Sequence, residues 1–215
     1  MKPILTALMM LMALLLPQSR PANAADRAGE FDYYVLALSW APSWCNTVDN
    51  PRDSISCDRG RKIGFTVHGL WPQSEQGWPS DCITRQSDPS RRETREMQDL
   101  MGSSGLAWYQ WRKHGRCSGL AAKDYFALMR KAAEQIQTPE VFSKLSREVS
   151  LPAKVVEEAF IEANPSLDRK SVTVTCQGNH FQEVRVCLAK DLSPRACAPD
   201  ASRDCTRNVL MPAPR

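Results

Sequence analysis

Eight cysteines restrict the folds open to this 215-residue chain more than any other feature of its sequence. An even number of cysteines in an exported chain is typical of a disulfide framework. Zinc sites, the alternative, usually contain cysteine pairs separated by two residues, whereas the closest cysteines here are eight positions apart. We therefore expect four disulfides among Cys45, Cys57, Cys82, Cys117, Cys176, Cys187, Cys197 and Cys205. Counting alone does not choose between the many possible pairings.

The first 24 residues predict a signal peptide. They combine a positive start at Lys2, an apolar run over residues 4–16, a helix-breaking proline and the triplet Ala-Asn-Ala at residues 22–24. This layout predicts cleavage after residue 24. A membrane anchor is the alternative, but the apolar run is shorter than the roughly 20 residues that cross a bilayer. We expect a periplasmic or secreted protein with one mature domain over 25–215 and no membrane partner.

The charge of the chain does not indicate its partner. The formal net charge is +4. Removal of the signal peptide, which contains Lys2 and Arg20 and no acidic residue, leaves +2. A balance this small does not by itself favour nucleic acid over other ligands. The mature length suits one domain with a single core.

Strand patterns occur near both ends of the mature chain. Residues 31–40 and 63–68 are apolar and rich in aromatic and β-branched side chains, and Gly69 and Pro72 predict the end of the second strand. Residues 171–176 and 181–188 flank Gly-Asn and predict a hairpin.

Helical patterns fill the middle of the chain. The apolar spacing predicts helices over residues 123–136 and 150–163, and Thr138-Pro139 predicts a further helix start. Strands around a helical middle indicate an α+β fold, in which one antiparallel sheet packs against several helices.

Two of the three histidines have similar surroundings. His68 and His114 each precede a glycine and lie near tryptophans, and His114 also lies between cations. A pair of histidines can cleave RNA, since one can take the proton of the ribose 2′-hydroxyl while the other protonates the leaving 5′-oxygen. Lys113 can offset the charge that builds on the phosphoryl oxygens. His180, near the predicted hairpin turn, lacks these features, and we expect its removal to leave activity near normal.

The chemistry alone does not decide between catalytic and structural histidines, because a two-histidine site needs no fixed spacing. Two longer motifs do. Residues 65–73 (FTVHGLWPQ) and 108–117 (WYQWRKHGRC) resemble the two active-site segments of the T2 ribonuclease family. The similarity begins at residues 34–40, and it resumes at Cys176 and the strand that ends in Cys187.

The resemblance implies a disulfide-linked α+β endoribonuclease that cleaves single-stranded RNA through a 2′,3′-cyclic phosphate, without metal or other cofactor. It implies that His114 is the general base, that His68 is the general acid and that Lys113 stabilises the phosphorane. Trp71 matches a position near a base-binding pocket, where an aromatic ring can stack on a base. With Trp71, we expect Gln73 and Tyr109 to bind substrate. RNA rather than DNA is the expected partner of a monomer.

One departure from the family concerns Tyr109 and Gln110, which stand where many members have histidine and glutamate. Gln110 can donate a hydrogen bond to a phosphoryl oxygen, but it cannot act as an acid or base. We expect it to share the catalytic cavity and to alter activity without abolishing it. A solvent-facing glutamine without a role is the alternative.

Two other functions stay open. The chain could be an RNA-binding module that has lost catalysis, although His68, Lys113 and His114 are all present. A zinc hydrolase is disfavoured because the sequence lacks H-E-x-x-H or a comparable helical pair of histidines.

We predict the disulfides Cys45–Cys57, Cys82–Cys117, Cys176–Cys205 and Cys187–Cys197. The second would join the segment after Trp71 to the end of the His114 segment.

Overall fold

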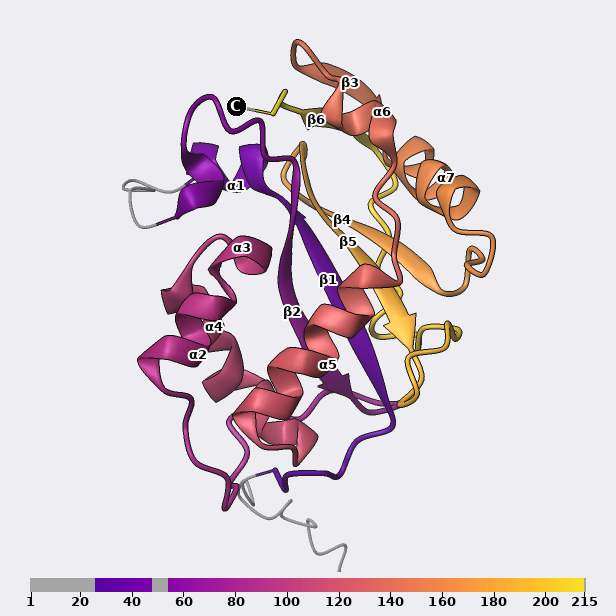
Figure 1. Cartoon of the computed structure of the whole chain (residues 1–215). Helices are drawn as coiled ribbons and strands as arrows, with labels where there is room; N and C mark the ends of the chain where they lie inside the picture. The colour runs from indigo at the N-terminus through magenta and orange to yellow at the C-terminus, as the bar shows by residue number, and fades with distance from the viewer. Residues whose placement is uncertain (1–25, 48–53, 215) are drawn as a thin grey trace, which may run out of the picture.

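A six-stranded sheet organises the structure, a computed structural model that describes residues 26–47 and 54–214 (Figure 1). The predicted signal peptide lies outside the described residues. The strand order is β2-β1-β5-β6-β3, and β4 pairs with β5 outside this path. All pairs are antiparallel except β5 with β6. The strands are β1 Tyr33–Trp40, β2 Phe65–Gln73, β3 Val149–Pro152, β4 Val172–Gln177, β5 His180–Leu188 and β6 Asn208–Met211.

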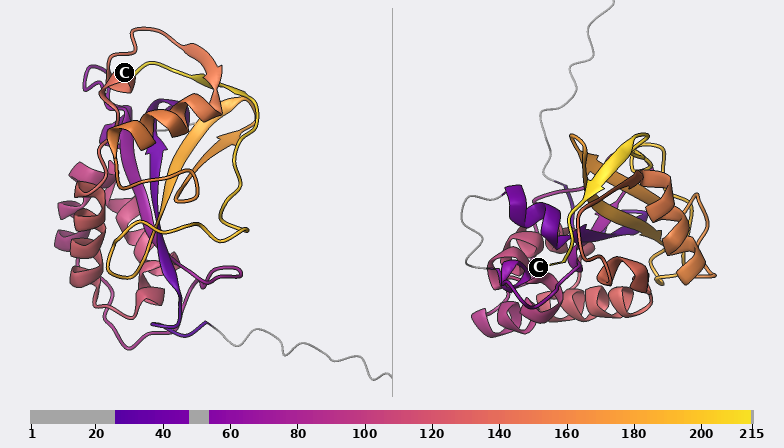
Figure 2. Two further views of the ribbon diagram at one scale, coloured as in Figure 1. Left: turned by 90° about the vertical axis from the view of Figure 1, so that its right-hand side faces the viewer. Right: turned by 90° about the horizontal axis from the view of Figure 1, so that it is seen from above.

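Helices α2 to α5 form a layer on one side of β1 and β2 (Figure 2). A short α1 follows β1 directly, and α7 lies near β4 at the other end of the sheet (Figure 1). The helices are α1 Ala41–Thr47, α2 Arg91–Glu96, α3 Gln98–Met101, α4 Ser104–Lys113, α5 Ala122–Glu134, α6 Glu140–Ser143 and α7 Ala153–Ala163. Two 3₁₀ turns cover Ile55–Cys57 and Gly115–Ser118.

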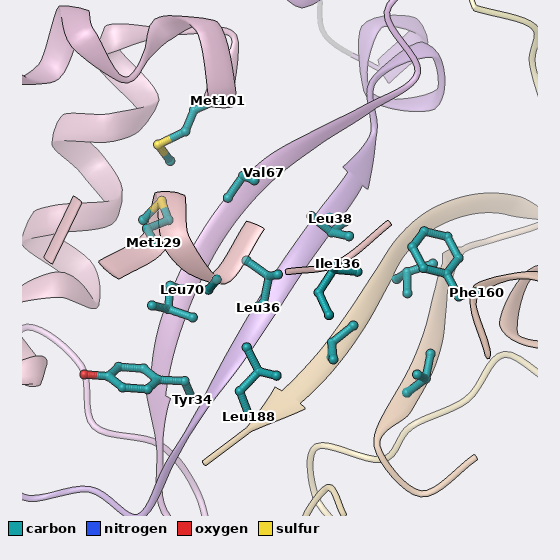
Figure 3. Close-up of a cluster of buried hydrophobic side chains, with 14 of the residues drawn as sticks. Tyr34, Leu36, Leu38, Val67, Leu70, Met101, Met129, Ile136, Phe160 and Leu188 are labelled. Atoms are coloured by element: carbon teal, nitrogen blue, oxygen red, sulfur yellow. The ribbon is translucent and has the colours of Figure 1, made fainter. Parts of the chain in front are cut away.

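The main core lies between the sheet and these helices. Leu36 of β1, Leu70 of β2 and Met129 of α5 are fully buried there (Figure 3). Burial of each such side chain contributes about 1.5–3 kcal/mol. The opposite face of β1, which carries Val35, belongs to a smaller buried cluster that includes Trp71. Strand β1 is therefore apolar on both faces, as its sequence indicated.

The predicted α+β class is confirmed, and three of the predicted strands have nearly the expected bounds. The exception is β2, which continues past Gly69 and Pro72 to Gln73, so the predicted end was wrong. Pro72 pairs with Tyr34 of β1, and β2 is the first strand in the sheet order. A proline is tolerated on such an edge because its missing N–H is not needed by a further strand.

The helical predictions were partly wrong. The helix predicted at 150–163 begins only at Ala153, because residues 149–152 form β3 and pair with β6. The start predicted at Thr138 leads to α6, which is only four residues long. Helices α2 to α4 and strand β6 were not predicted. The helix predicted at 123–136 corresponds to α5.

The structure contains the four expected disulfides, Cys45–Cys57, Cys82–Cys117, Cys176–Cys205 and Cys187–Cys197. Cys82–Cys117 joins the segment after β2 to the turn that follows α4. It thereby connects the two sequence motifs that contain the histidines.

Candidate active site

His68 lies at an irregularity in β2. Ala37 of β1 pairs with Gly69 and Leu38 pairs with Val67, so His68 is the extra residue of a β-bulge. A bulged residue is released from the ladder and its side chain is redirected. The imidazole is 33% exposed and reaches a cavity described below.

Glu183 of β5 holds one nitrogen of the His68 ring. The His68 Nδ1 lies 2.5 Å from Glu183 Oε1, and the Ser39 hydroxyl donates to the same oxygen over 3.0 Å. Arg185 donates to Glu183 Oε2 from Nε and Nη2, over 3.0 and 2.9 Å. The ionised carboxylate can only accept hydrogen bonds, so Nδ1 is the donor and Nε2 is the nitrogen that can exchange a proton with a ligand.

Glu183 stays ionised although its side chain is only 2% exposed. Burial alone would raise its pKa, but the hydrogen bond and charge of His68, together with Arg185, outweigh this and lower the pKa to about 2. A buried carboxylate is stable only when such partners compensate for its lost hydration.

His114 follows the last residue of α4. Helix α4 begins at the Ser103 cap, whose hydroxyl accepts from the Leu106 N–H, and the His114 N–H closes its last turn on Gln110. The pKa of His114 is lowered to about 4, mainly by burial and further by the charges of His68 and Lys113. The ring is therefore neutral at pH 7 and can accept a proton. Its Nδ1 is buried and has no hydrogen-bond partner among the described residues.

Trp71 contacts both histidines. Its ring is 5.3 Å from that of His68 and 5.4 Å from that of His114, measured between centroids. The Trp71 Nε1 donates to Gln110 Oε1 over 2.7 Å. Gly69 makes this contact possible, because a Cβ there would come within 2.3 Å of Trp71 Nε1 and 2.6 Å of Gln110 Oε1. One indole therefore contacts both candidate proton-transfer groups.

Lys113 is paired with Asp81. Its Nζ donates to Asp81 Oδ2 over 2.5 Å, and the Asp81 N–H donates to the Lys113 carbonyl over 2.9 Å. This side-chain hydrogen bond lowers the pKa of Asp81 and raises the pKa of Lys113. Asp81 is adjacent to Cys82, so the Cys82–Cys117 disulfide holds this pair next to the end of α4.

A cavity of about 670 Å³ opens at His68. Tyr109 of α4 and Trp44 of α1 line it with aromatic rings, and Asn179 and His180 line it with polar groups. Tyr109 is 56% exposed and Trp44 is 43% exposed, so both rings are accessible to a ligand. Apolar walls with a few polar groups are typical of small-ligand sites.

Three of the expected site residues are largely buried. Gln110 is 1% exposed and accepts the hydrogen bond of Trp71, so the solvent-facing alternative is wrong, whereas its influence on the chemistry stays a prediction. Trp71 is 9% exposed, and Arg185 lies over its ring at 5.1 Å, so little of the indole is open to a base. Gln73 is buried at the end of β2, opposite Tyr33 and outside the cavity lining.

The other expected residues differ in their relation to the cavity. Tyr109 lines it together with His68, whereas Lys113 and His114 are not among its lining residues. His180, for which no catalytic role is expected, lines the same cavity as His68.

Three charged residues of the site were missed by sequence reasoning. Glu183 and Arg185 lie on β5, in register with Ser39 and Ala37 of the neighbouring β1. The alternation of residues 181–188 placed both on the face opposite Val184, which was a usable signal for a polar cluster on that face. No comparable sequence signal marks Asp81.

The described residues offer neither a metal site nor a membrane span. No three His, Cys, Asp or Glu side chains in residues 26–47 and 54–214 are grouped to hold a metal ion. None of the helices in these ranges is long and apolar enough to cross a membrane.

The Gln110 contact predicts how its variants behave. Gln110→Ala removes the partner of a buried indole N–H, which costs about 1–3 kcal/mol. We expect it to lower kcat/KM by about tenfold, as loss of one such positioning bond would. Gln110→Glu keeps an acceptor for Trp71 and should cost less, but its charge one helical turn before His114 favours the imidazolium form. Because a base works above its pKa, the acid limb of the pH–rate profile should move to higher pH.

Profiles of kcat/KM against pH for wild type and both variants test this expectation. Gln135→Glu adds the same charge at an exposed residue after α5 and is the matched control. Three superimposable curves would show that Gln110 has no influence on the chemistry.

Comparison with known proteins was consistent across sequence and structure. The model of the Ribonuclease T2 family matches residues 31–197. A ribonuclease of Aeromonas hydrophila is 38% identical over 157 residues, covering 72% of this chain and 69% of that protein. Ribonuclease I of Escherichia coli strain K12 is 30% identical over 224 residues, covering 82% and 83%. The solved structure of RNase NT in complex with 5′-AMP superimposes with a TM-score of 0.60 at 25% identity, covering 86% of this chain and 99% of that one.

Proposed function

Because the chain belongs to the ribonuclease T2 family and is thus an endoribonuclease, we propose that its two histidines cleave RNA by transphosphorylation without a metal. The single observation that carries this proposal is the contact of one indole, Trp71, with both imidazoles. The 2′-oxygen attacks the phosphorus, the bond to the 5′-oxygen breaks, and a 2′,3′-cyclic phosphate is released.

The surroundings of the histidines favour different roles. His114 is neutral above about pH 4, so it can take the proton of the 2′-hydroxyl. The carboxylate of Glu183 accompanies His68, so a proton on Nε2 of His68 can pass to the leaving 5′-oxygen. In the second step the roles reverse: His68 takes a proton from water, the water oxygen attacks the cyclic phosphate, and His114 protonates the departing 2′-oxygen.

Lys113 would stabilise the phosphorane. It directly precedes the proposed base, and its pairing with Asp81 raises its pKa, so the ammonium remains charged. Asp81 is 63% exposed, so this pair is accessible and a phosphate could share the ammonium. A cation at this place offsets charge that develops in the transition state.

The cavity beside His68 would bind the base of the leaving nucleotide. The proposed acid must contact the 5′-oxygen of that nucleotide, and His68 lines the cavity. Trp44 and Tyr109 supply rings for stacking, and Asn179 can hydrogen-bond a base edge. The complex of RNase NT with 5′-AMP supports a nucleotide as the ligand of this fold.

We further propose export to the periplasm or the medium. The predicted signal peptide supports this location. The four disulfides support it as well, because disulfides persist in oxidising compartments.

Digestion of yeast RNA and of dinucleoside phosphates tests the reaction. Cleavage should continue in EDTA, because the proposed chemistry uses only side chains. Mass spectrometry should detect the 2′,3′-cyclic phosphate before the 3′-phosphate. A His114→Ala preparation, purified in parallel, controls for contaminating nuclease. Loss of activity in EDTA would contradict the mechanism, and tight RNA binding without cleavage would favour a binding module.

A further inference from the structure

Glu183 is a buried carboxylate whose two oxygens have different partners. Oε2 accepts both hydrogen bonds from Arg185, and Oε1 accepts from Ser39 and His68. Removal of a carboxylate from water costs several kcal/mol unless its partners compensate. Because Arg185 binds only Oε2, Oε1 remains available to the Ser39 hydroxyl and to Nδ1 of His68.

His68, in contrast, depends on its neighbours for orientation. It is the bulged residue of β2, so the ladder does not constrain its side chain direction as it would in a regular strand. Two contacts orient the ring, the hydrogen bond to Glu183 and the edge-on packing against Trp71. Arg185 connects these two contacts, because its guanidinium binds Glu183 and lies over Trp71.

We propose that Glu183 is a positioning residue that makes His68 an effective general acid. It fixes the ring through Nδ1, directs Nε2 toward the leaving oxygen and supplies the negative charge that the imidazolium needs. Arg185 holds the carboxylate in place. This inference rests on the acid role proposed for His68.

The proton inventory of the step is balanced. As the phosphorus–oxygen bond breaks, the Nε2 proton of His68 moves to the 5′-oxygen and the 2′-hydroxyl proton moves to His114. His68 becomes neutral and keeps its Nδ1–H bond to Glu183. The carboxylate is never protonated, so its contribution is orientation and charge.

Leaving-group chemistry provides a test that a purely structural role would not pass. The alkoxide of uridylyl-3′,5′-adenosine needs a proton in order to leave, whereas the nitrophenolate of uridine 3′-(4-nitrophenyl phosphate) leaves without one. Glu183→Gln should lower kcat on the dinucleotide by about 10- to 1,000-fold, because a mispositioned acid loses part of the roughly 100- to 10,000-fold that general acid catalysis contributes. On the nitrophenyl ester the loss should be about threefold or less, because no acid is required. KM should change little on either substrate.

Further variants keep the inference testable if Glu183→Gln folds poorly, which circular dichroism and thermal unfolding would reveal. Ser39→Ala removes one hydrogen bond from the same carboxylate oxygen and should show a smaller effect with the same selectivity. Glu183→Asp retains the charge and should recover part of the loss. Glu148→Gln makes the same charge change at an exposed residue and is the matched control.

The outcomes separate this inference from the proposed reaction. Equal losses on both substrates for Glu183→Gln, or no loss on either, would overturn the positioning role, provided that His68→Ala shows leaving-group selectivity. If His68→Ala itself loses equal activity on both substrates, the acid assignment fails, and the inference that rests on it fails too. Selective loss in both variants supports both statements.

Discussion

His68→Ala and His114→Ala should each lower kcat on RNA by about 100- to 10,000-fold, because each variant lacks one proton-transfer group. The two losses should not add fully, since the residues act in one concerted step. Steady-state kinetics on a dinucleoside phosphate, with folding verified by circular dichroism, provides the measurement.

His180→Ala is the matched control, because His180 is the remaining histidine of the chain. It lines the cavity, but within the described part of the chain it makes no hydrogen bond to either proposed proton-transfer nitrogen. We expect its KM to rise severalfold, on the order of one lost hydrogen bond, and its kcat to stay close to wild type. If His180→Ala damages kcat more than His68→Ala does, the assignment of the site is wrong.

The low pKa of His114 also predicts the pH dependence. A base must be unprotonated, so its contribution is present above its pKa and is lost as the pH falls through about 4. The acid limb of kcat/KM, which reports the free enzyme, should therefore lie well below the ordinary histidine pKa of about 6.5. An acid limb near pH 6.5 would contradict the buried, neutral state of His114.

Removal of the Cys82–Cys117 disulfide should have the largest effect on stability. The two cysteines are 35 residues apart, and a loop of this size corresponds to about 4 kcal/mol of unfolding free energy in the chain-entropy model. We expect the Cys82→Ala, Cys117→Ala double variant to lose about this much in urea denaturation. It should also lose activity, because Asp81 would no longer be held beside Lys113.

The Cys187–Cys197 pair provides the comparison. It spans 10 residues, for which the same model gives about 3 kcal/mol, and it lies away from Lys113 in the sequence. Its removal should destabilise the protein less and leave kcat closer to wild type under folding conditions. Peptide mapping without reduction should recover the Cys82–Cys117 link, and free thiol at either position would contradict the structure.

The parts of the site that were predictable from the sequence lie in two continuous motifs. His68 and His114 stand in contiguous segments whose composition identifies them. Glu183 could not be assigned in this way, because it is 115 positions from His68 and meets it only through the register of β5 on β1. Gln110 was identified, but its direction was not, since helix α4 was not predicted and the pattern could not show which face meets Trp71.

The parts of the fold that the sequence did not predict also depend on contacts between distant segments. Strand β1 is central and apolar on both faces, so it was evident from composition. β3 is four residues long and exists because β6 pairs with it, which no local pattern reveals. The continuation of β2 through Pro72 depends on its place at the sheet edge, which is a tertiary property.

The distance between the proposed acid and base depends on how the helical layer packs against the sheet at Trp71. His68 belongs to the sheet, His114 ends a helix of the covering layer, and both imidazoles contact the ring of Trp71. A slight slide of α4 over β2 would pull the proton acceptor away from the donor while leaving each imidazole chemically intact. Heat or denaturant should therefore inactivate the enzyme by loosening the contact between α4 and β2 before the strands of the sheet separate.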